Sequence, residues 1–297
     1  MSANRTTLDA LNAADAGGFV GIVGEVFEHA PWVAERAAAL RPFATVEALH
    51  AAMFAQIADA PEVARIAIIA SHPELAGKAA QSGDMTAASV AEQGSAGLDR
   101  LTPAQFERFA ELNRAYRERF GFPFLICVRH YTRALILSEF ERRLDRTREE
   151  EVDAALKQIF AITRLRIAGR VDGPGQPKVD GRLSTHVLDA VAGRPAAGIR
   201  IELRDLSDGA PGLLMKAETT NGDGRTAMPL ISGQPLRIGH YELAFHIGAY
   251  FAGVGSSGAG PPFLDVVPVR FAIAEPEGHY HFPLLATPWS YSTYRGS

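Results

Sequence analysis

The sequence predicts two domains, an all-α helical bundle followed by an all-β, transthyretin-like antiparallel sandwich. Its 297 residues suit about two domains, because a single core stops growing beyond roughly 250–300 residues. Ala, Glu and Arg with helical periodicity dominate before residue 169, and Gly, Pro, Thr and alternating patterns follow it. The segment GRVDGPGQPK at 169–178 holds three glycines and two prolines, which is typical of a linker. We therefore expect a helical domain over 1–168, a linker over 169–177 and a sandwich over 178–297.

Start and stop signals for helices support the first part of this prediction. The motif TPAQ at 102–105 is a capping box with proline at the first helical position, and Gly121 supplies a stop. The motif TREE at 147–150 is a second capping box, and Gly169 closes the helix that it opens. Thr45 is a suitable N-cap for a third helix. Apolar stripes at helical spacing follow these starts: Val46, Leu49, Met53 and Ile57; Phe106, Phe109, Leu112, Tyr116 and Phe120; Val152, Ala155, Leu156, Ile159 and Ile162.

Alternation of apolar and polar residues indicates strands in the second part. Ile199, Ile201 and Leu203 face one way, and the charged residues between them face the other. The same pattern recurs between Val267 and Ile273. Several such strands, separated by Gly, Pro, Asn and Asp turns, favour an antiparallel sandwich.

Bulk composition excludes several classes of protein. A formal net charge of −4 gives no electrostatic footprint for nucleic acid or for anionic membranes. Cys127 is the only cysteine, so no disulfide forms within the chain, which fits a reducing compartment. The sequence shows no secretory signal, no membrane-length apolar stretch and no Ser-Lys-Leu type ending. We expect a cytoplasmic protein.

Three polar residues of the first part are candidates for chemistry. His72 precedes Pro73, which suits the start of a helix after the histidine, and the ring can point into a cleft. A plain cap or surface residue is the alternative for His72, and a surface carboxylate for Glu92. Arg166 falls on the apolar stripe of Ile159 and Ile162, where a guanidinium needs an anionic partner or a ligand. A structural salt bridge or snorkelling at the helix end would also explain Arg166.

Three motifs follow one another in the first part of the chain: SHPELAG at 71–77, SVAEQGSAGLDRLT at 89–102 and LNRAYRERFGFPFLICVR at 112–129. Together they resemble 2-oxo-4-hydroxy-4-carboxy-5-ureidoimidazoline (OHCU) decarboxylase across nearly all of 5–168. The resemblance implies that His72 is the catalytic acid and base, and that Glu92 and Arg166 bind and orient the substrate. It implies a pocket lined by Pro73, Ser89, Gln93 and the backbone of Phe124, Leu125, Ile126, Cys127 and Val128. From its apolar surroundings alone, Cys127 is a buried, inert thiol.

Histidines and an arginine mark the second part. His279 and His281 are two apart on a predicted strand and therefore share a face, and His186 lies in another strand-like segment. Arg225 ends the turn NGDGR at 221–225. These residues suit general-base hydrolysis with an oxyanion-stabilising arginine. The three histidines could also be the ligands of a zinc site. A third alternative is that they are surface or packed histidines with no chemical role.

Five further motifs favour the first alternative: LSTHVLDAVAGRPAAG at 183–198, TNGDGR at 220–225, HYELAF at 240–245, HYHFPLL at 279–285 and YSTYRGS at 291–297. They resemble 5-hydroxyisourate hydrolase, the transthyretin-like enzyme of urate breakdown, across 178–297. The resemblance implies that His186, Arg225, His281 and Tyr294 contact the substrate or act in catalysis, supported by His279 and Ser297. It also implies a homotetramer with sites at subunit interfaces and no metal.

The two resemblances predict a bifunctional enzyme of urate degradation. The second domain would hydrolyse 5-hydroxyisourate to OHCU, and the first would decarboxylate OHCU to (S)-allantoin. No thiamine, pyridoxal or metal motif occurs in the sequence, so we expect no cofactor and a substrate ring that serves as the electron sink. Urate oxidase is the implied pathway partner. A transthyretin-like ligand carrier fused to a helical bundle and a zinc-dependent cyclic amide hydrolase remain the alternatives.

Overall fold

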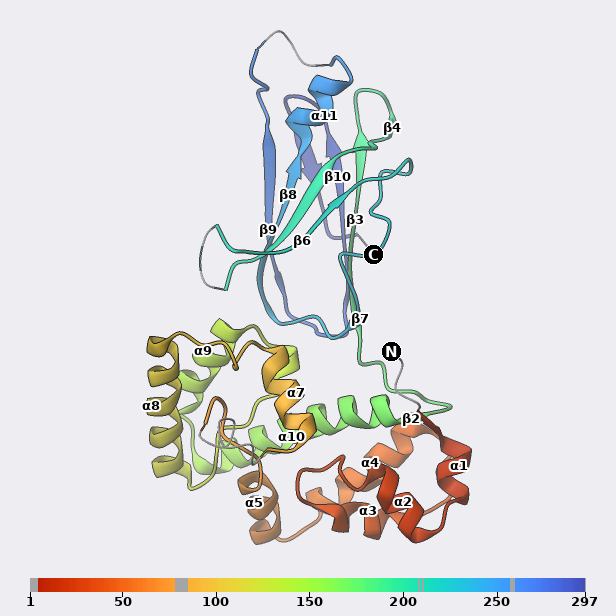
Figure 1. The fold of residues 1–297 in the computed structure, drawn as a ribbon, viewed down its shortest axis with the longest axis vertical. Coiled ribbons are helices and arrows are strands. Elements are labelled where there is room, and N and C mark those ends of the chain that lie inside the picture. The colour runs from red at the N-terminus through yellow and green to blue at the C-terminus, as the bar shows by residue number, and fades with distance from the viewer. Residues whose placement is uncertain (1–4, 78–84, 208, 210, 257–259, 297) are drawn as a thin grey trace. The chain divides into compact units, whose positions relative to one another are not determined.

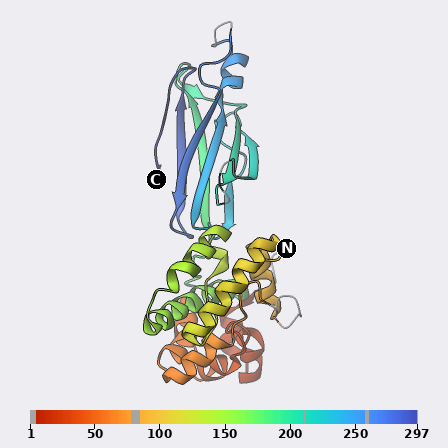
Figure 2. The same ribbon diagram turned by 90° about the vertical axis from the view of Figure 1, so that its left-hand side faces the viewer.

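The chain forms one helical unit and one unit built from strands. The structure is a computed structural model that describes residues 5–77, 85–207, 209, 211–256 and 260–296. Contacts divide it into Met1–Arg129 with Ile136–Val179, and His130–Leu135 with Asp180–Ser297. Figures 1 and 2 show coiled ribbons in the first unit and arrows in the second. The predicted fold class, a helical bundle followed by a sandwich, is confirmed.

Local capping decides where the helices of the first unit begin and end. Thr45 caps α4 by accepting a hydrogen bond from the Ala48 backbone at 2.9 Å. The capping box at Thr102 opens α8, and Gly121 ends it in the left-handed conformation with φ of 81°. These predicted signals are confirmed. The helices are α1 Leu8–Ala13, α2 Ala16–Val23, α3 Pro31–Ala38, α4 Val46–Ala58, α5 Glu62–Ala70, α7 Ala87–Ser95, α8 Pro103–Phe120, η1 Val128–His130, α9 Arg133–Arg143 and α10 Arg148–Arg170.

The long helix α10 carries the buried face that the sequence predicts. Ile159, Ile162 and Arg166 all lie on that face, and Arg166 is 8% exposed. The helix passes through Gly169 and ends at Arg170, so the predicted stop at Gly169 is one residue early. It ends there because Val171 is extended and begins β2 (Val171–Asp172).

The segment predicted as a linker packs against the helical unit at its start. β2 pairs in parallel with β1 (Thr6–Thr7). Pro174 and Gly175 accept hydrogen bonds from the backbone of Val46 and Glu47 at 2.9 and 3.1 Å. Residues 171, 172, 174 and 175 of the predicted linker are therefore held in place by backbone bonds.

The predicted helix after His72 is not found in the described residues. α5 ends at Ala70, and Pro73–Gly77 form a turn. Ala76 has a φ of 51°, which a helix cannot contain. The expectation that Pro73 begins a helix is therefore wrong for residues 73–77, and the chain instead bends away from α5 at His72.

Two sheets form the second unit. One has the order β11–β10–β3–β4 with β7 also paired to β3, and the other has the order β6–β5–β8–β9. Among the described strands of this unit, the pairs are antiparallel, as predicted, apart from β3 with β10, which run in parallel. The elements are β3 Gly181–Asp189, β4 Arg194–Pro195, β5 Arg200–Asp205, β6 Leu213–Thr219, β7 Ile231–Gln234, β8 Gly239–His246, α11 Ile247–Gly253, β9 Val266–Ile273, β10 His279–Ala286 and β11 Tyr291–Thr293.

The core of the sandwich is built from one face of strands such as β5 and β10. Ile201 and Leu203 of β5 and Tyr280 and Phe282 of β10 belong to one buried cluster. His279 and His281 alternate with these aromatic residues and therefore project from the opposite face of β10. None of the helices in the described residues combines the length and apolarity that a membrane crossing needs.

Candidate active sites

His72 is the central group of the first site. It lies where the chain leaves α5 and is 6% exposed. Its Nδ1 donates to the Ile68 carbonyl at 2.8 Å, so the neutral ring carries its proton on Nδ1 and keeps a lone pair on Nε2. Among the described residues, buried Nε2 finds no hydrogen-bond partner. A buried, unpaired acceptor in a cleft is suited to receive a proton from a ligand.

Burial sets the protonation state of His72. It lowers the pKa of the ring from 6.5 to about 4, although the Ile68 bond and the negative Glu28 act in the opposite direction. The imidazole is therefore neutral at pH 7. A neutral ring can act as a base through Nε2.

Arg166 holds two carboxylates from different parts of the chain. Its Nε and Nη2 donate to the two oxygens of Glu92 at 2.9 and 2.8 Å. Its Nη1 donates to Glu28 Oε2 at 2.8 Å and to the Val26 carbonyl at 3.4 Å. Nη2 also donates to Ser89 Oγ at 3.2 Å. All five N–H groups of the guanidinium therefore have a protein partner.

Glu28 is a site residue that the sequence analysis did not identify. It is 2% exposed, and its Oε1 accepts hydrogen bonds from Thr86 Oγ1 at 2.7 Å and Ser89 Oγ at 3.0 Å. Burial alone raises the pKa of Glu28, but the Thr86 and Arg166 hydrogen bonds and the Arg166 charge outweigh it, so the pKa lies below 4.5. Glu28 is thus a buried anion. The only local sign in GEVFEHAPW is a charged residue beside apolar ones, which does not distinguish it from surface glutamates.

A small cavity of about 30 Å³ brings most of the predicted residues together. His72, Pro73, Ser89, Glu92, Gln93, Leu125, Ile126, Val128 and Arg166 line it, with Leu75 and Ile162. Phe124 and Cys127 are outside this lining set. Phe124 stacks on Phe140 with ring centres 4.0 Å apart, and Cys127 packs with Ile162 and Leu165. Leu125, Ile126 and Val128 therefore line the cavity, whereas Phe124 and Cys127 pack into the core.

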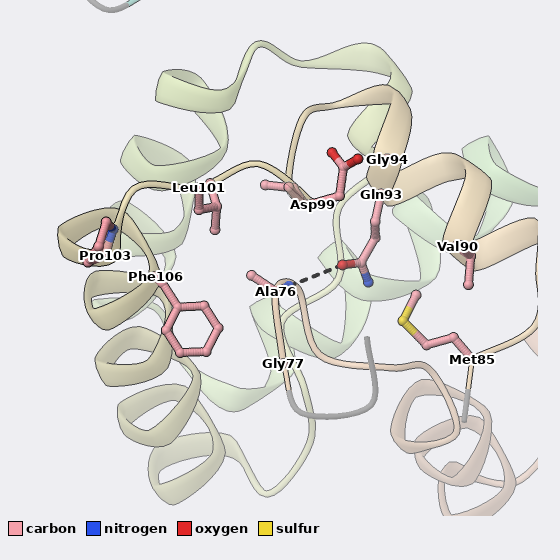
Figure 3. A pocket seen from close by; sticks show the side chains of 11 residues that line it. Ala76, Gly77, Met85, Val90, Gln93, Gly94, Asp99, Leu101, Pro103 and Phe106 are labelled. Atoms are coloured by element: carbon pink, nitrogen blue, oxygen red, sulfur yellow. Dashed lines mark hydrogen bonds between the residues drawn. The ribbon is translucent and has the colours of Figure 1, made fainter. Parts of the chain in front are cut away.

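A larger cavity of about 450 Å³ shares Gln93 with the first. Figure 3 shows Gln93 on its wall, with Met85 and Val90 to one side and Leu101, Pro103 and Phe106 to the other. The Gln93 amide accepts from Ala76 N at 3.1 Å and donates to the Glu74 carbonyl at 3.2 Å. Gln93 therefore ties the turn after His72 to α7.

A buried ion pair supports the wall made by residues 124–128. Arg143 is 3% exposed and Glu151 is fully buried. Arg143 Nε donates to the Glu151 carboxylate at 3.0 and 3.1 Å, and its Nη1 donates to the Leu125 carbonyl at 2.7 Å. The Tyr116 hydroxyl also donates to Glu151. This network fixes the Leu125 backbone, which lines the small cavity.

The second candidate site lies on the outer face of β3 and β10. His186 Nδ1 and His281 Nε2 are 2.8 Å apart and share a hydrogen bond. Their rings stack with centres 4.9 Å apart. His281 Nδ1 lies 2.9 Å from Ser184 Oγ, and His279 Nε2 lies 3.4 Å from the same hydroxyl. Ser184 is another residue that the sequence analysis did not single out.

The turn with Arg225 and the C-terminal tail meet this face through backbone bridges. Arg225 pairs with His186, and Gly296 pairs with His281. A Cβ on Gly296 would lie 2.9 Å from His281 Cδ2, so the tail can approach this closely only at a glycine. Tyr294 is 57% exposed. Ser297 lies outside the described residues.

Burial and positive charge keep the two histidines neutral. Burial and then Arg225 lower the pKa of His186. Burial, His186, Arg225 and His279 lower the pKa of His281 against a smaller opposing effect of Ser184. Neutral imidazoles can take a proton from water. In the part of the chain that the structure describes, no group of three or more His, Cys, Asp and Glu is placed to hold a metal ion.

Comparisons with known proteins assign each unit a set of relatives. Residues 12–168 match the OHCU decarboxylase family, and residues 183–296 match the HIUase/Transthyretin family. The chain is 42% identical over 164 residues to a 2-oxo-4-hydroxy-4-carboxy-5-ureidoimidazoline decarboxylase of Haloferax volcanii, covering 55% of this chain and 95% of the relative. It is 52% identical over 115 residues to a 5-hydroxyisourate hydrolase of Deinococcus radiodurans, covering 39% of this chain and 95% of the relative. A solved structure of (S)-allantoin synthase is 34% identical, with a TM-score of 0.51, and the match covers 98% of this chain and 100% of that one.

Proposed function

The chain belongs to the OHCU decarboxylase family through its helical unit and to the HIUase/Transthyretin family through its sandwich, and from this premise we propose how it carries out two consecutive steps of urate degradation. The sandwich hydrolyses 5-hydroxyisourate to OHCU. The helical unit decarboxylates OHCU to (S)-allantoin. The observation that carries this proposal is the gathering of His72, Glu92 and Arg166, from three distant segments, around one cavity.

In the hydrolase step, His186 and His281 act as one general base. Their shared hydrogen bond lets either ring pass a proton to the other. The base removes a proton from water, and the hydroxide attacks a ring carbonyl of 5-hydroxyisourate. Arg225, whose positive charge reaches both histidines, stabilises the negative charge that develops on the carbonyl oxygen. The carbon–nitrogen bond of the ring then breaks, and the nitrogen receives a proton.

Tyr294 and Ser297 are proposed to contact the hydrolase substrate through the C-terminal tail. The Gly296 bridge to His281 supports this role because it holds the tail beside the base. An exposed Tyr294 is free to turn toward a ligand or toward a neighbouring subunit. We propose a homotetramer on the basis of family membership, with these sites at subunit interfaces.

In the decarboxylase step, His72 moves the proton. Loss of CO₂ sends its bonding electron pair into the ring, where a ring nitrogen takes up a proton from solvent and a double bond forms between the carbon that lost CO₂ and the neighbouring ureido-bearing carbon. The hydroxyl then becomes a carbonyl by losing its proton, and the ureido-bearing carbon must be protonated. Neutral His72 takes a proton from the substrate hydroxyl at Nε2 and can return it at a single position. Delivery from one side of the ring supports the (S) product.

Glu92 is proposed to bind the ureido N–H groups, because a carboxylate accepts such donors in pairs. Arg166 has its N–H groups engaged by Glu92, Glu28, Ser89 and Val26. Its proposed contribution is to orient Glu92, and it contacts the substrate carboxylate only if one of those bonds is exchanged. Pro73, Ser89, Gln93 and the backbone of Leu125, Ile126 and Val128 complete the proposed pocket.

Complementary inactivation tests the assignment of the two steps. His72→Asn should abolish the conversion of OHCU while 5-hydroxyisourate decays at the wild-type rate. His186→Asn should do the reverse. Ultraviolet absorbance follows the first intermediate, and circular dichroism follows (S)-allantoin when urate oxidase supplies the substrate. A ligand carrier would bind 5-hydroxyisourate without accelerating its decay, and a metal-dependent hydrolase would lose activity with a chelator. Either result would overturn the proposal.

The cellular setting follows from the pathway. Urate oxidase makes 5-hydroxyisourate, so we propose that it works with this protein in the cytoplasm. Because both catalytic units belong to one chain, OHCU released by the hydrolase unit meets the decarboxylase site at a raised local concentration.

A further inference from the structure

The outer face of β3 and β10 carries more polar groups than the paired histidines alone. The two strands run in parallel with His281 opposite Ser184 and Pro283 opposite His186. Side chains alternate along each strand, so Ser184 and His186 share a face with His279 and His281. A one-residue change of register would separate the serine from the histidines.

These four side chains form one continuous line of hydrogen bonds. His186 Nδ1 meets His281 Nε2 at 2.8 Å, and His281 Nδ1 meets Ser184 Oγ at 2.9 Å. Ser184 Oγ then meets His279 Nε2 at 3.4 Å, which is the longest link. Each inner group, His281 and Ser184, makes one bond on either side. Ser184 is 8% exposed, whereas His279 at the end is exposed.

Two arrangements of protons satisfy every link with neutral rings and with the Ser184 hydroxyl donating along the line. In the first, each group donates toward His279: His186 Nδ1–H to His281, His281 Nδ1–H to Ser184, and the serine hydroxyl to His279 Nε2. In the second, every bond is reversed, and His279 Nε2–H begins the line. The first leaves a lone pair on His186 Nε2, and the second leaves a proton there.

We propose that Ser184 and His279 extend the histidine pair into a proton relay between the hydrolase site and solvent, an inference that rests on the proposed hydrolase function. In the first arrangement, His186 Nε2 takes a proton from the attacking water. His186 passes its Nδ1 proton to His281, His281 passes its own to Ser184, and Ser184 passes its hydroxyl proton to His279 Nε2. His279 releases its Nδ1 proton to solvent. One proton enters and one leaves, and every group ends neutral in the second arrangement.

The reverse transfer serves the second half of the reaction. When the ring carbon–nitrogen bond breaks, the leaving nitrogen needs a proton. His186 donates it from Nε2, and the line returns to the first arrangement as His279 takes a proton from solvent at Nδ1. The base is thereby reset without a separate step. Ser184 and His279 act through other residues, so both are positioning and relay groups rather than catalytic residues.

Lowered pKa values of His186 and His281 agree with this scheme, because the relay needs neutral rings near pH 7. Burial of Ser184 agrees as well, since water would otherwise compete for its hydroxyl.

Substitution at Ser184 tests the inner link in the full-length chain. Ser184→Ala should lower kcat for 5-hydroxyisourate hydrolysis by about 10- to 100-fold with KM little changed. Ser184→Thr restores a hydroxyl and should recover most of the rate. Equal loss in both variants, or no loss in Ser184→Ala, would overturn the relay. Circular dichroism of the strand signal verifies that the sandwich of each variant is folded, because OHCU decarboxylation reports only on the helical unit.

Substitution at His279 tests the outer end and does not disturb the core, because this side chain is exposed. His279→Gln should lower kcat, and added imidazole should raise it again by carrying the proton from Ser184 to solvent. Wild-type kcat should not respond to imidazole. A structural role for His279 would predict a rate insensitive to imidazole, and that result would overturn the relay. Failure of the wild-type chain to hydrolyse 5-hydroxyisourate would instead overturn the proposed function itself.

Discussion

Arg166 and Glu92 are 74 residues apart in the chain, yet they meet through two hydrogen bonds of 2.9 and 2.8 Å. The guanidinium and the carboxylate match as a bidentate pair, which a lysine cannot reproduce. The same guanidinium holds Glu28 at 2.8 Å. One cation on α10 therefore places two anions, of which Glu92 lines the candidate decarboxylase cavity.

The first prediction concerns this pair. Arg166→Lys should lower kcat for OHCU decarboxylation by about 10²- to 10³-fold, because Glu92 loses its fixed orientation. Hydrolysis of 5-hydroxyisourate should be unchanged, since the residues proposed for that step belong to the other unit. Arg164→Lys is the matched control on the same helix, because Arg164 bonds Lys178 and Glu47 instead. A decarboxylase as active in Arg166→Lys as in this control would contradict the role.

The second prediction concerns Glu28. Glu28→Gln should lower the free energy of unfolding at pH 7 by about 1–3 kcal/mol, because it removes a buried, hydrogen-bonded charge. The pKa of Glu28 is lowered in the folded state, so its stabilisation is present above 4.5 and is lost as pH falls through the folded pKa. Wild type and Glu28→Gln should therefore converge in stability as pH falls below the lowered pKa of Glu28. Urea unfolding of both proteins at pH 7 and at low pH measures this difference, and a constant gap would argue against it.

The third prediction compares two neighbouring arginines. Arg143→Met should cost about 3 kcal/mol, because the buried Glu151 carboxylate loses its buried cationic partner, with Arg146 remaining at 3.2 Å, and the Leu125 carbonyl loses its hydrogen bond. Arg142→Met should change stability by less than about 0.5 kcal/mol, because Arg142 pairs with Glu139 at the surface. Thermal or urea unfolding of the two variants provides the comparison. Similar free energies of unfolding for the two variants would show that the buried network does not stabilise the fold.

The fourth prediction concerns the protonation of His72. Burial lowers the pKa of this ring to about 4, so its NMR signals should not titrate between pH 8 and 5. The decarboxylation rate should show no decline centred on 6.5. An imidazole titration near the ordinary value would contradict the neutral, buried state.

The lowered pKa of His72 also makes the free energy of unfolding depend on pH. In the unfolded chain His72 takes a proton as pH falls below 6.5, but the folded chain resists protonation down to about 4. Between these two pKa values the unfolded state binds more protons, so the free energy of unfolding should decrease as the pH is lowered from 6.5 to about 4. His50, which is also buried and has a pKa of about 4, should add to the loss. His50→Gln should therefore reduce the pH dependence, which unfolding experiments at pH 7 and 5 can measure.

The fifth prediction concerns the C-terminal tail. Gly296→Ala should lower the rate of 5-hydroxyisourate hydrolysis, because the new Cβ would lie 2.9 Å from His281 Cδ2 and displace the ring or the tail. Gly260→Ala is a control, because no atom of the described residues lies within 4 Å of its Cβ. Decarboxylation should be unaffected in both. Full hydrolase activity in Gly296→Ala would show that the tail can move without cost to the site.

Periodicity predicted most of the fold because it is a local property of the chain. The capping boxes at Thr102 and Thr147 begin α8 and α10 as expected. A turn of about 100° per residue placed Arg166 on the buried face of its helix. Alternation placed His279 and His281 on one face of β10 and the aromatic residues on the other. Local patterns did not reveal that β3 and β10 run in parallel, because strand direction depends on how distant segments pair.

The sequence by itself determined the two-domain order, the faces of the main helices and strands, and the resemblances that point to urate degradation. Only the tertiary structure revealed Glu28 as the second anion on Arg166, 138 residues away, and Ser184 as the group joining His279 to His281. The physical reason is that capping and periodicity act between residues a few positions apart. A buried ion pair or a relay depends instead on which distant side chains the packed core brings within about 3 Å of one another.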